Sequence, residues 1–149
     1  MGFTKKILVP TDFSEGSGKA VHFATAIALE HGASIELMHA FEIPSVAFLE
    51  GSMIATPAMV ADISGLAQKQ LDVAADQIRE AGVEVSAHLL QGVAYTEITR
   101  AAQDLGCDLV VMSTHGRTGL RHALIGSVAE RVVRTAPIPV LTLRPPSDD

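Results

Sequence analysis

The sequence has few of the residues that mark disulfide-rich, membrane-spanning or nucleic-acid-binding proteins. Among its 149 residues there are one cysteine, no tryptophan and 4% aromatic residues. Because the single cysteine, Cys107, cannot form an internal disulfide, a hydrophobic core has to stabilise the fold. Lysine and arginine number 11 against 17 aspartate and glutamate residues, which gives a net charge of -6. Nonspecific nucleic-acid binding depends on clustered cations, so this charge argues against it.

No apolar run is long enough to cross a membrane or to form the core of a signal peptide. The N-terminal residues MGFTKKILVP contain two lysines followed by a short apolar run that ends at Pro10. They also lack Ser or Thr at the position that N-myristoylation requires. We therefore expect a cytoplasmic protein that does not insert into membranes.

What the sequence does contain is the composition and periodicity of one α/β domain over residues 1–149, with 48% hydrophobic residues. Strands are predicted at 6–10, 34–40, 83–90, 108–112 and 140–144, and helices at 17–31, 57–81, 94–105 and 127–135. Strands that alternate with helices predict an open five-stranded parallel sheet with helices on both faces. The third strand alternates polar and apolar residues most clearly, which indicates an edge or a half-exposed position.

The stretch 41–56 has no helical or strand periodicity, although it carries several large apolar side chains. A loop of this length in a compact domain is often a lid or a binding loop. An apolar flap that covers the core is an equally open interpretation.

The stretch from Leu109 to Glu130 carries the clearest sign of a binding site. A buried strand is followed by a loop with Gly116 and Gly119, and then by a helix that opens at Gly126. Such a helix start presents free backbone N–H groups and the positive end of the helix dipole, and glycines let the backbone approach an anion. The sequence therefore predicts a phosphate site here, although neither the Walker A nor the dinucleotide-binding fingerprint is present.

A second polar group is expected at the same edge of the sheet. Asp12 directly follows the first strand, just as the glycine loop follows the fourth. In open parallel sheets, ligands bind beyond the carboxyl ends of the strands where the winding reverses. If the first and fourth strands are neighbours, Asp12 and the loop after Met112 share one crevice.

The spacing of this loop, S-x2-G-x9-G-S from Ser113 to Ser127, is similar to the G-x2-G-x9-G-[ST] pattern of the nucleotide-binding branch of the universal stress protein family. The resemblance extends along the whole chain through the segments KILVPTDFS, LMHA, CDLVVMSTHGRTGL and IGSVAERVVRTAPIPVLTLR. It implies a Rossmann-like fold of the adenine nucleotide alpha hydrolase type with strand order 3-2-1-4-5.

The resemblance also implies a stress-response regulator that binds ATP, or AMP or ADP, and that can hold Mg²⁺ through the phosphates. Asp12 and the backbone of Ala40 would contact the adenine. The implied nucleotide-binding positions are Pro10, Thr11, Asp12, Ala40, Met112, Ser113, His115, Gly116, Arg117, Gly119, Gly126, Ser127 and Val128. A homodimer would form through the fifth strand, at Val140, Leu141, Thr142 and Leu143.

Each of these residues also has a purely structural interpretation. Ser127 and Glu130 form an S-x-x-E capping box, and Asp12 could cap the turn that follows it. The glycines could serve only the turn, and Arg117 and Arg121 could be solvated surface charges. Ser113 stands where the family usually has glycine, and serine is excluded from most positive-φ conformations.

The sequence names no catalytic residues. Its histidines lack metal-binding spacing, and a structural hydrogen-bonding role is expected for His115 in the glycine loop. Cys107 is expected to be an inert buried thiol. The leading hypothesis is therefore a binding module with an unknown regulatory partner protein. The alternatives are a slow ATPase that uses the same cleft and a dimeric scaffold that binds no nucleotide.

Overall fold

The computed structural model describes residues 2–43, 46–48, 51–53, 56–116 and 125–144. Its elements are β1 (Lys6–Pro10), α1 (Glu15–His31), β2 (Ser34–Phe41), β3 (Val46–Phe48), β4 (Gly51–Met53), α2 (Pro57–Glu80), β5 (Val85–Gln91), α3 (Ala94–Asp104), β6 (Leu109–Ser113), α4 (Ser127–Thr135) and β7 (Val140–Leu143). No helix among the described residues is long and apolar enough to cross a membrane.

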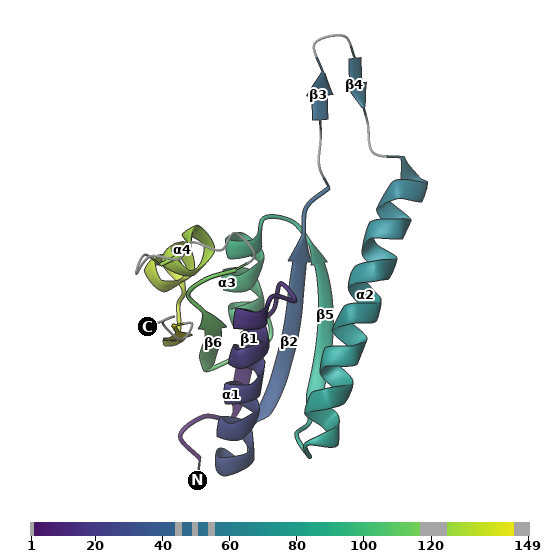
Figure 1. The fold of residues 1–149 in the computed structure, drawn as a ribbon. Coiled ribbons are helices and arrows are strands. Elements are labelled where there is room, and N and C mark those ends of the chain that lie inside the picture. Colours follow the sequence, from purple (N-terminus) through teal and green to yellow (C-terminus); the bar gives the residue numbers. More distant parts are fainter. Residues whose placement is uncertain (1, 44–45, 49–50, 54–55, 117–124, 145–149) are drawn as a thin grey trace, which may run out of the picture.

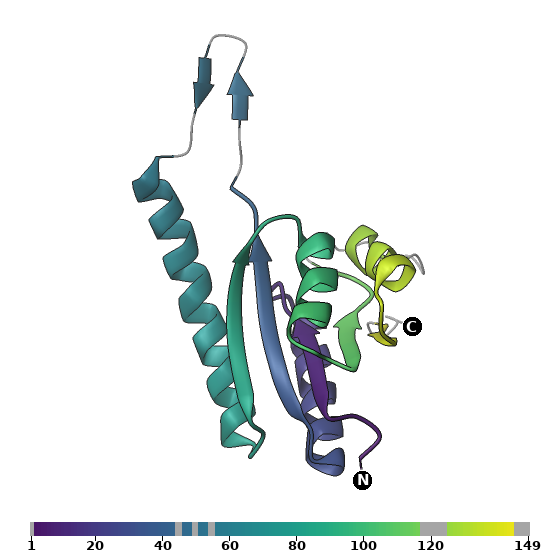
Figure 2. The ribbon, with the colours of Figure 1, turned by 180° about the vertical axis from the view of Figure 1, so that it is seen from behind.

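The main sheet has the order β5-β2-β1-β6-β7, and every neighbouring pair in it is parallel. Numbered along the chain without the short β3 and β4, this order is the predicted 3-2-1-4-5. Helices α1 and α2 cover one face and α3 and α4 cover the other (Figures 1 and 2). The expectation of a parallel sheet with β5 at an edge is confirmed.

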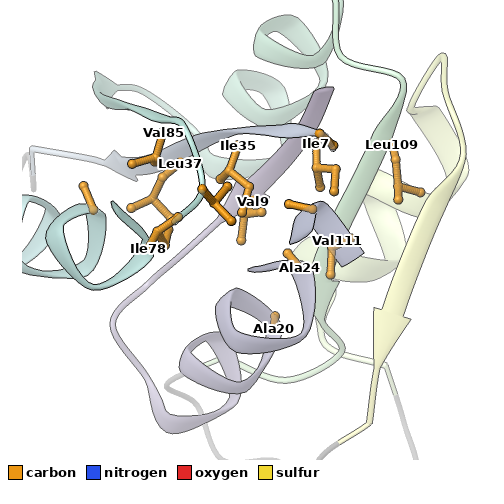
Figure 3. Close-up of a cluster of buried hydrophobic side chains, with 14 of the residues drawn as sticks. Ile7, Val9, Ala20, Ala24, Ile35, Leu37, Ile78, Val85, Leu109 and Val111 are labelled. Atoms are coloured by element: carbon orange, nitrogen blue, oxygen red, sulfur yellow. The ribbon is translucent and has the colours of Figure 1, made fainter. Parts of the chain in front are cut away.

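Two hydrophobic clusters hold the helices to the sheet, because successive strand residues point to opposite faces. On the α1 and α2 side, Ile7, Val9, Ile35, Leu37 and Val111 are buried against Ala20 and Ala24 (Figure 3). The alternate residues Leu8, Met38 and Val110 pack on the other side with Ile98 and Val132. The buried alanines of α1 let this helix lie close to the sheet.

The helix ends follow local sequence signals. Ser14 caps α1 by accepting the Ser17 N–H, so the helix begins two residues before the predicted start at 17. Gly32 ends α1 in the left-handed region at φ 69°. Thr56 caps α2, with Pro57 at the first helical position, as predicted.

The stretch between β2 and α2 departs from the prediction. Residues 46–48 and 51–53 form an antiparallel pair, β3 and β4, where no strand was predicted. Each strand has only three residues, which is too short for a recognisable alternation. The pair extends away from the main sheet (Figures 1 and 2), so for these residues the interpretation as a flap over the core is wrong.

Candidate functional site

A cleft of about 270 Å³ opens at the carboxyl ends of β1, β2 and β6. Strands β1 and β6 are neighbours, so the β1–α1 turn and the loop after β6 face one another across it, as expected. The residues that line the cleft are Pro10, Thr11, Asp12, Ser17, Met38, His39, Ala40, Ala94, Ile98, Met112, Ser113, Thr114, His115, Gly116, Gly126, Ser127, Val128 and Ala129.

Every predicted nucleotide-binding residue that the structure describes lines this cleft. Arg117 and Gly119, and also Arg121, lie outside the described residues. Seven residues that line the cleft were not predicted from the sequence, namely Ser17, Met38, His39, Ala94, Ile98, Thr114 and Ala129. A topological signal could have found two of these, because in a parallel sheet each helix that follows a strand starts at the same edge. Ala94 and Ile98 belong to α3, which follows β5.

The β1–α1 turn is fixed by hydrogen bonds within the turn. Asp12 Oδ1 accepts the Ser14 N–H at 3.0 Å, and Thr11 Oγ1 accepts the Phe13 N–H at 3.1 Å. Phe13 has a φ of 64°, and among the described residues it is the only one other than glycine with a positive φ. Asp12 therefore does cap its own turn, and its Oδ2 lies beside Gly116 in the cleft.

His39 supports the same turn from β2. Its Nδ1 lies 2.7 Å from the carbonyl oxygen of Thr11. Because a carbonyl oxygen only accepts, Nδ1 carries the hydrogen and donates it. The His39 ring also packs on Phe13, with ring centroids 4.4 Å apart. His39 thus fixes the turn through a hydrogen bond and through a ring contact.

Ser113 fits at the end of β6 without an unusual backbone conformation. It is absent from the described residues with positive φ, so the objection that serine cannot replace a positive-φ glycine does not apply here. Its Oγ donates to the carbonyl oxygen of His115 at 2.9 Å and accepts the His115 N–H at 3.3 Å. The hydroxyl therefore fixes the first turn of the loop.

Gly116 and Gly126 are required for space rather than for backbone conformation, since neither has a positive φ. A Cβ at position 126 would lie 2.9 Å from the carbonyl oxygen of Thr114, which also accepts the Gly126 N–H at 2.7 Å. A Cβ at position 116 would overlap Asp12 Oδ2. The atoms that exclude a side chain at these two positions thus belong to the protein itself.

Two helices start at the cleft without a side-chain cap. The N-cap of α4 is Gly126 and that of α3 is Val93, and neither helix has a side-chain capping hydrogen bond. Ser127 is the first residue of α4, so the interpretation as a capping box is wrong; Glu130 pairs with Arg134 instead. The positive ends of both helix dipoles therefore face the cleft.

His115 has the structural hydrogen bond that was expected of it. Its Nδ1 lies 2.8 Å from Thr114 Oγ1, which is 3.2 Å from the carbonyl oxygen of Leu143. The carbonyl takes the Thr114 hydroxyl hydrogen, so His115 Nδ1–H donates to Thr114. His115 Nε2 is buried and has no hydrogen-bond partner in the described part of the chain.

The described residues contain no group of three or more His, Cys, Asp or Glu side chains that could hold a metal ion. Cys107 lies at the opposite end of β6 from the cleft. Burial, reinforced by the charge of Glu36, raises the pKa of its thiol to about 11. The prediction of a buried, inert thiol is in line with this shift.

The model of the universal stress protein family matches residues 4–144. The chain therefore belongs to the universal stress protein family, as its resemblance indicated.

Individual relatives agree over nearly the whole chain. The universal stress protein MJ0531 of Methanocaldococcus jannaschii is 35% identical over 147 residues, which are 97% of this chain and 85% of that protein. The solved structure of MJ0577, from the same organism, has a TM-score of 0.81 at 25% identity over 95% of this chain and 96% of its own. A universal stress protein solved in complex with cAMP shares the fold, with a TM-score of 0.72 at 22% identity over 95% and 97% of the two chains.

Proposed function

We propose that this protein is a homodimeric regulatory module of the stress response that binds an adenine nucleotide in the cleft. The observation that carries the proposal is that one cleft combines the Asp12 carboxylate with the uncapped start of α4. The carboxylate suits hydrogen-bond donors of an adenine or ribose, and a helix N-terminus suits phosphate. The apolar side chains of Ile98 and Met112 line the cleft and offer a surface for a base.

The proposed ligand is ATP, or AMP or ADP. The complex of a family member with cAMP supports an adenine nucleotide as the chemical class. Phosphates would follow the backbone from Ser113 to Gly116 and reach Ser127 and Val128 at the start of α4. Asp12 is the only carboxylate among the described residues of the cleft, so a Mg²⁺ ion would depend mainly on phosphate oxygens.

The proposed dimer forms through β7. Within the described sheet this strand pairs only with β6, and its side chains, Val140 to Leu143, are half-buried. The carbonyl oxygen of Leu143 accepts hydrogen bonds from both the N–H and the hydroxyl of Thr114, which lines the cleft. Only Thr114 would therefore separate the dimer interface at β7 from the ligand. Through this residue, a bound nucleotide could affect the partner surface.

The test is to denature the purified protein and to analyse the supernatant for adenine nucleotide by mass spectrometry. We also expect added ATP to raise the melting temperature, because a ligand that binds only the folded state stabilises it. Absence of both a co-purified nucleotide and an ATP-dependent shift would overturn the proposal. Phosphate release measured in the same samples tests the alternative of a slow ATPase.

A further inference from the structure

One wall of the cleft is formed by the β1–α1 turn and the start of α1, and the other by the loop after β6. The two walls are in contact at Gly116 and at Gly16. At the first, Gly116 in the loop after β6 lies against the Asp12 carboxylate. At the second, Gly16 in the first turn of α1 lies against the start of that loop. A Cβ on Gly16 would be 2.7 Å from Ser113 Oγ and 3.0 Å from the carbonyl oxygen of His115. Real Cβ atoms do not approach other atoms as closely as the first of these distances, so no larger residue fits at position 16 in this arrangement.

The hydroxyl of Ser113 is the group that occupies this space. It donates to the carbonyl oxygen of His115, and both oxygens lie directly in front of Gly16. The Ser113 Cβ is farther away, at 3.5 Å, an ordinary van der Waals distance. Removing the hydroxyl alone would therefore leave room for a methyl group on residue 16, apart from the contact with the carbonyl of His115.

We propose that Ser113 and Gly16 form a positioning pair that sets the separation of the two cleft walls. The Ser113 hydroxyl holds the backbone of the loop at His115, and the absence of a side chain at Gly16 lets α1 approach it. Because α1 carries the Asp12 turn at its start, this contact fixes where Asp12 lies relative to Gly116. The pair thereby controls how a bound nucleotide spans the cleft, an effect that rests on the proposed function.

The experiment is a double-mutant cycle with Gly16→Ala, Ser113→Ala and the variant that carries both changes. We expect Gly16→Ala to weaken ATP binding about tenfold, because the new methyl group displaces the loop. Adenosine, which lacks the phosphates that the loop would hold, should lose only about twofold. Ser113→Ala alone should cost about twofold, and the double variant should bind about as well as Ser113→Ala.

Gly18→Ala is the matched control, because it lies two residues along the same helix and an added Cβ there meets nothing within 4 Å. It should leave ATP affinity unchanged and slightly raise the melting temperature, since alanine favours helix over glycine. Equal effects of Gly16→Ala and Gly18→Ala on ATP affinity would contradict the pairing. Additive effects in the double variant, or equal losses for ATP and adenosine, would contradict it as well.

The melting temperature separates failure of this inference from failure of the proposed function. If the wild-type protein binds no nucleotide, the proposed function fails, but the steric coupling still predicts that Gly16→Ala lowers the melting temperature and that Ser113→Ala restores part of the loss. If nucleotide binds and Gly16→Ala changes neither affinity nor melting temperature, the pairing is wrong and the proposed function stands.

Discussion

Two aspartates at opposite ends of the sheet show how the same type of side chain can have two different roles. Asp108 lies just before β6, at the amino end of the sheet, and accepts hydrogen bonds from the Thr4 hydroxyl and from the N–H groups of Lys5, at 2.8 Å, and Lys6, at 3.4 Å. Asp12 lies just after β1, at the carboxyl end. Its Oδ1 accepts the Ser14 N–H within its own turn, and its Oδ2 lies beside Gly116 in the cleft.

The difference follows from the direction of parallel strands. At the amino end, the start of β1 presents backbone N–H groups, and the Asp108 carboxylate accepts them and ties β1 to β6. At the carboxyl end, the chain turns away into helices, which opens a cleft and aims the helix N-termini at it. We therefore expect substitutions at the carboxyl end to change ligand binding and those at the amino end to change stability.

The largest effect on binding is expected from Gly126→Val. A side chain at this position would be forced against the carbonyl oxygen of Thr114, 2.9 Å from the new Cβ, and would move the start of α4. Overpacking of this kind costs about 1–3 kcal/mol, so the affinity for ATP should fall by up to about 100-fold. Titration calorimetry measures the loss.

Gly65→Val in α2 serves as the control for this variant, because an added Cβ there meets nothing within 4 Å. The control should bind ATP like the wild type. A Gly126→Val protein that remains folded by circular dichroism and retains wild-type affinity would show that the phosphates are not held at the start of α4.

The next-largest effect on ATP affinity is expected from substitution of Asp12. Asp12→Ala removes both the acceptor for the Ser14 N–H and the carboxylate in the cleft. We expect ATP affinity to fall about tenfold, as for the loss of a charged hydrogen-bond partner. Asp12→Asn keeps an oxygen for Ser14 and removes the charge, so the comparison of the two variants separates the turn from the charge. Unchanged affinity in both variants would exclude Asp12 as a ligand contact.

Asp108 should show the opposite behaviour. Partial desolvation of its carboxyl alone would raise the pKa, but the hydrogen bonds from Thr4, Lys5 and Lys6 outweigh this effect and lower the pKa. A lowered pKa in the folded state stabilises the protein at neutral pH, and this contribution is lost as the pH falls below about 4 through the pKa of the folded state.

Asp108→Asn should therefore lower the free energy of unfolding at pH 7 by about 1 kcal/mol, a small value because Asp108 is exposed to solvent. The variant should lose less stability than the wild type between pH 6 and about pH 3. Urea unfolding at several pH values measures both effects. ATP affinity should not change, and a large loss of affinity would break the contrast between the two ends of the sheet.

The smallest effect is expected at Cys107, also at the amino end. With a pKa of about 11, the thiol is almost entirely protonated at pH 8. Iodoacetamide should leave the native protein unlabelled over an hour and should label it fully in urea, as intact mass measures. Rapid labelling of the native protein would show that the start of β6 is open to solvent.

The sequence by itself determined the five strands of the main sheet and the four helices, because apolar periodicity and glycine or proline punctuation are local signals. The order of these strands was implied only by the resemblance of the whole chain to the universal stress protein family. The sequence also placed Asp12 and the glycine loop at one edge, since parallel strands carry their carboxyl ends to the same side. The short strands β3 and β4 escaped prediction because three residues carry no readable period.

Only the tertiary structure decided which atoms of the cleft walls lie against its glycines. A side chain is excluded at Gly116 by the Asp12 carboxylate, at Gly126 by the carbonyl oxygen of Thr114, and at Gly16 by the Ser113 hydroxyl. The contacts at Gly116 and Gly16 join residues about a hundred positions apart in the sequence, so no local pattern could reveal them. The spacing that begins at Ser113 predicted a phosphate loop. Serine fits at the start of this loop because Gly16 of α1, which has no side chain, leaves space for its hydroxyl.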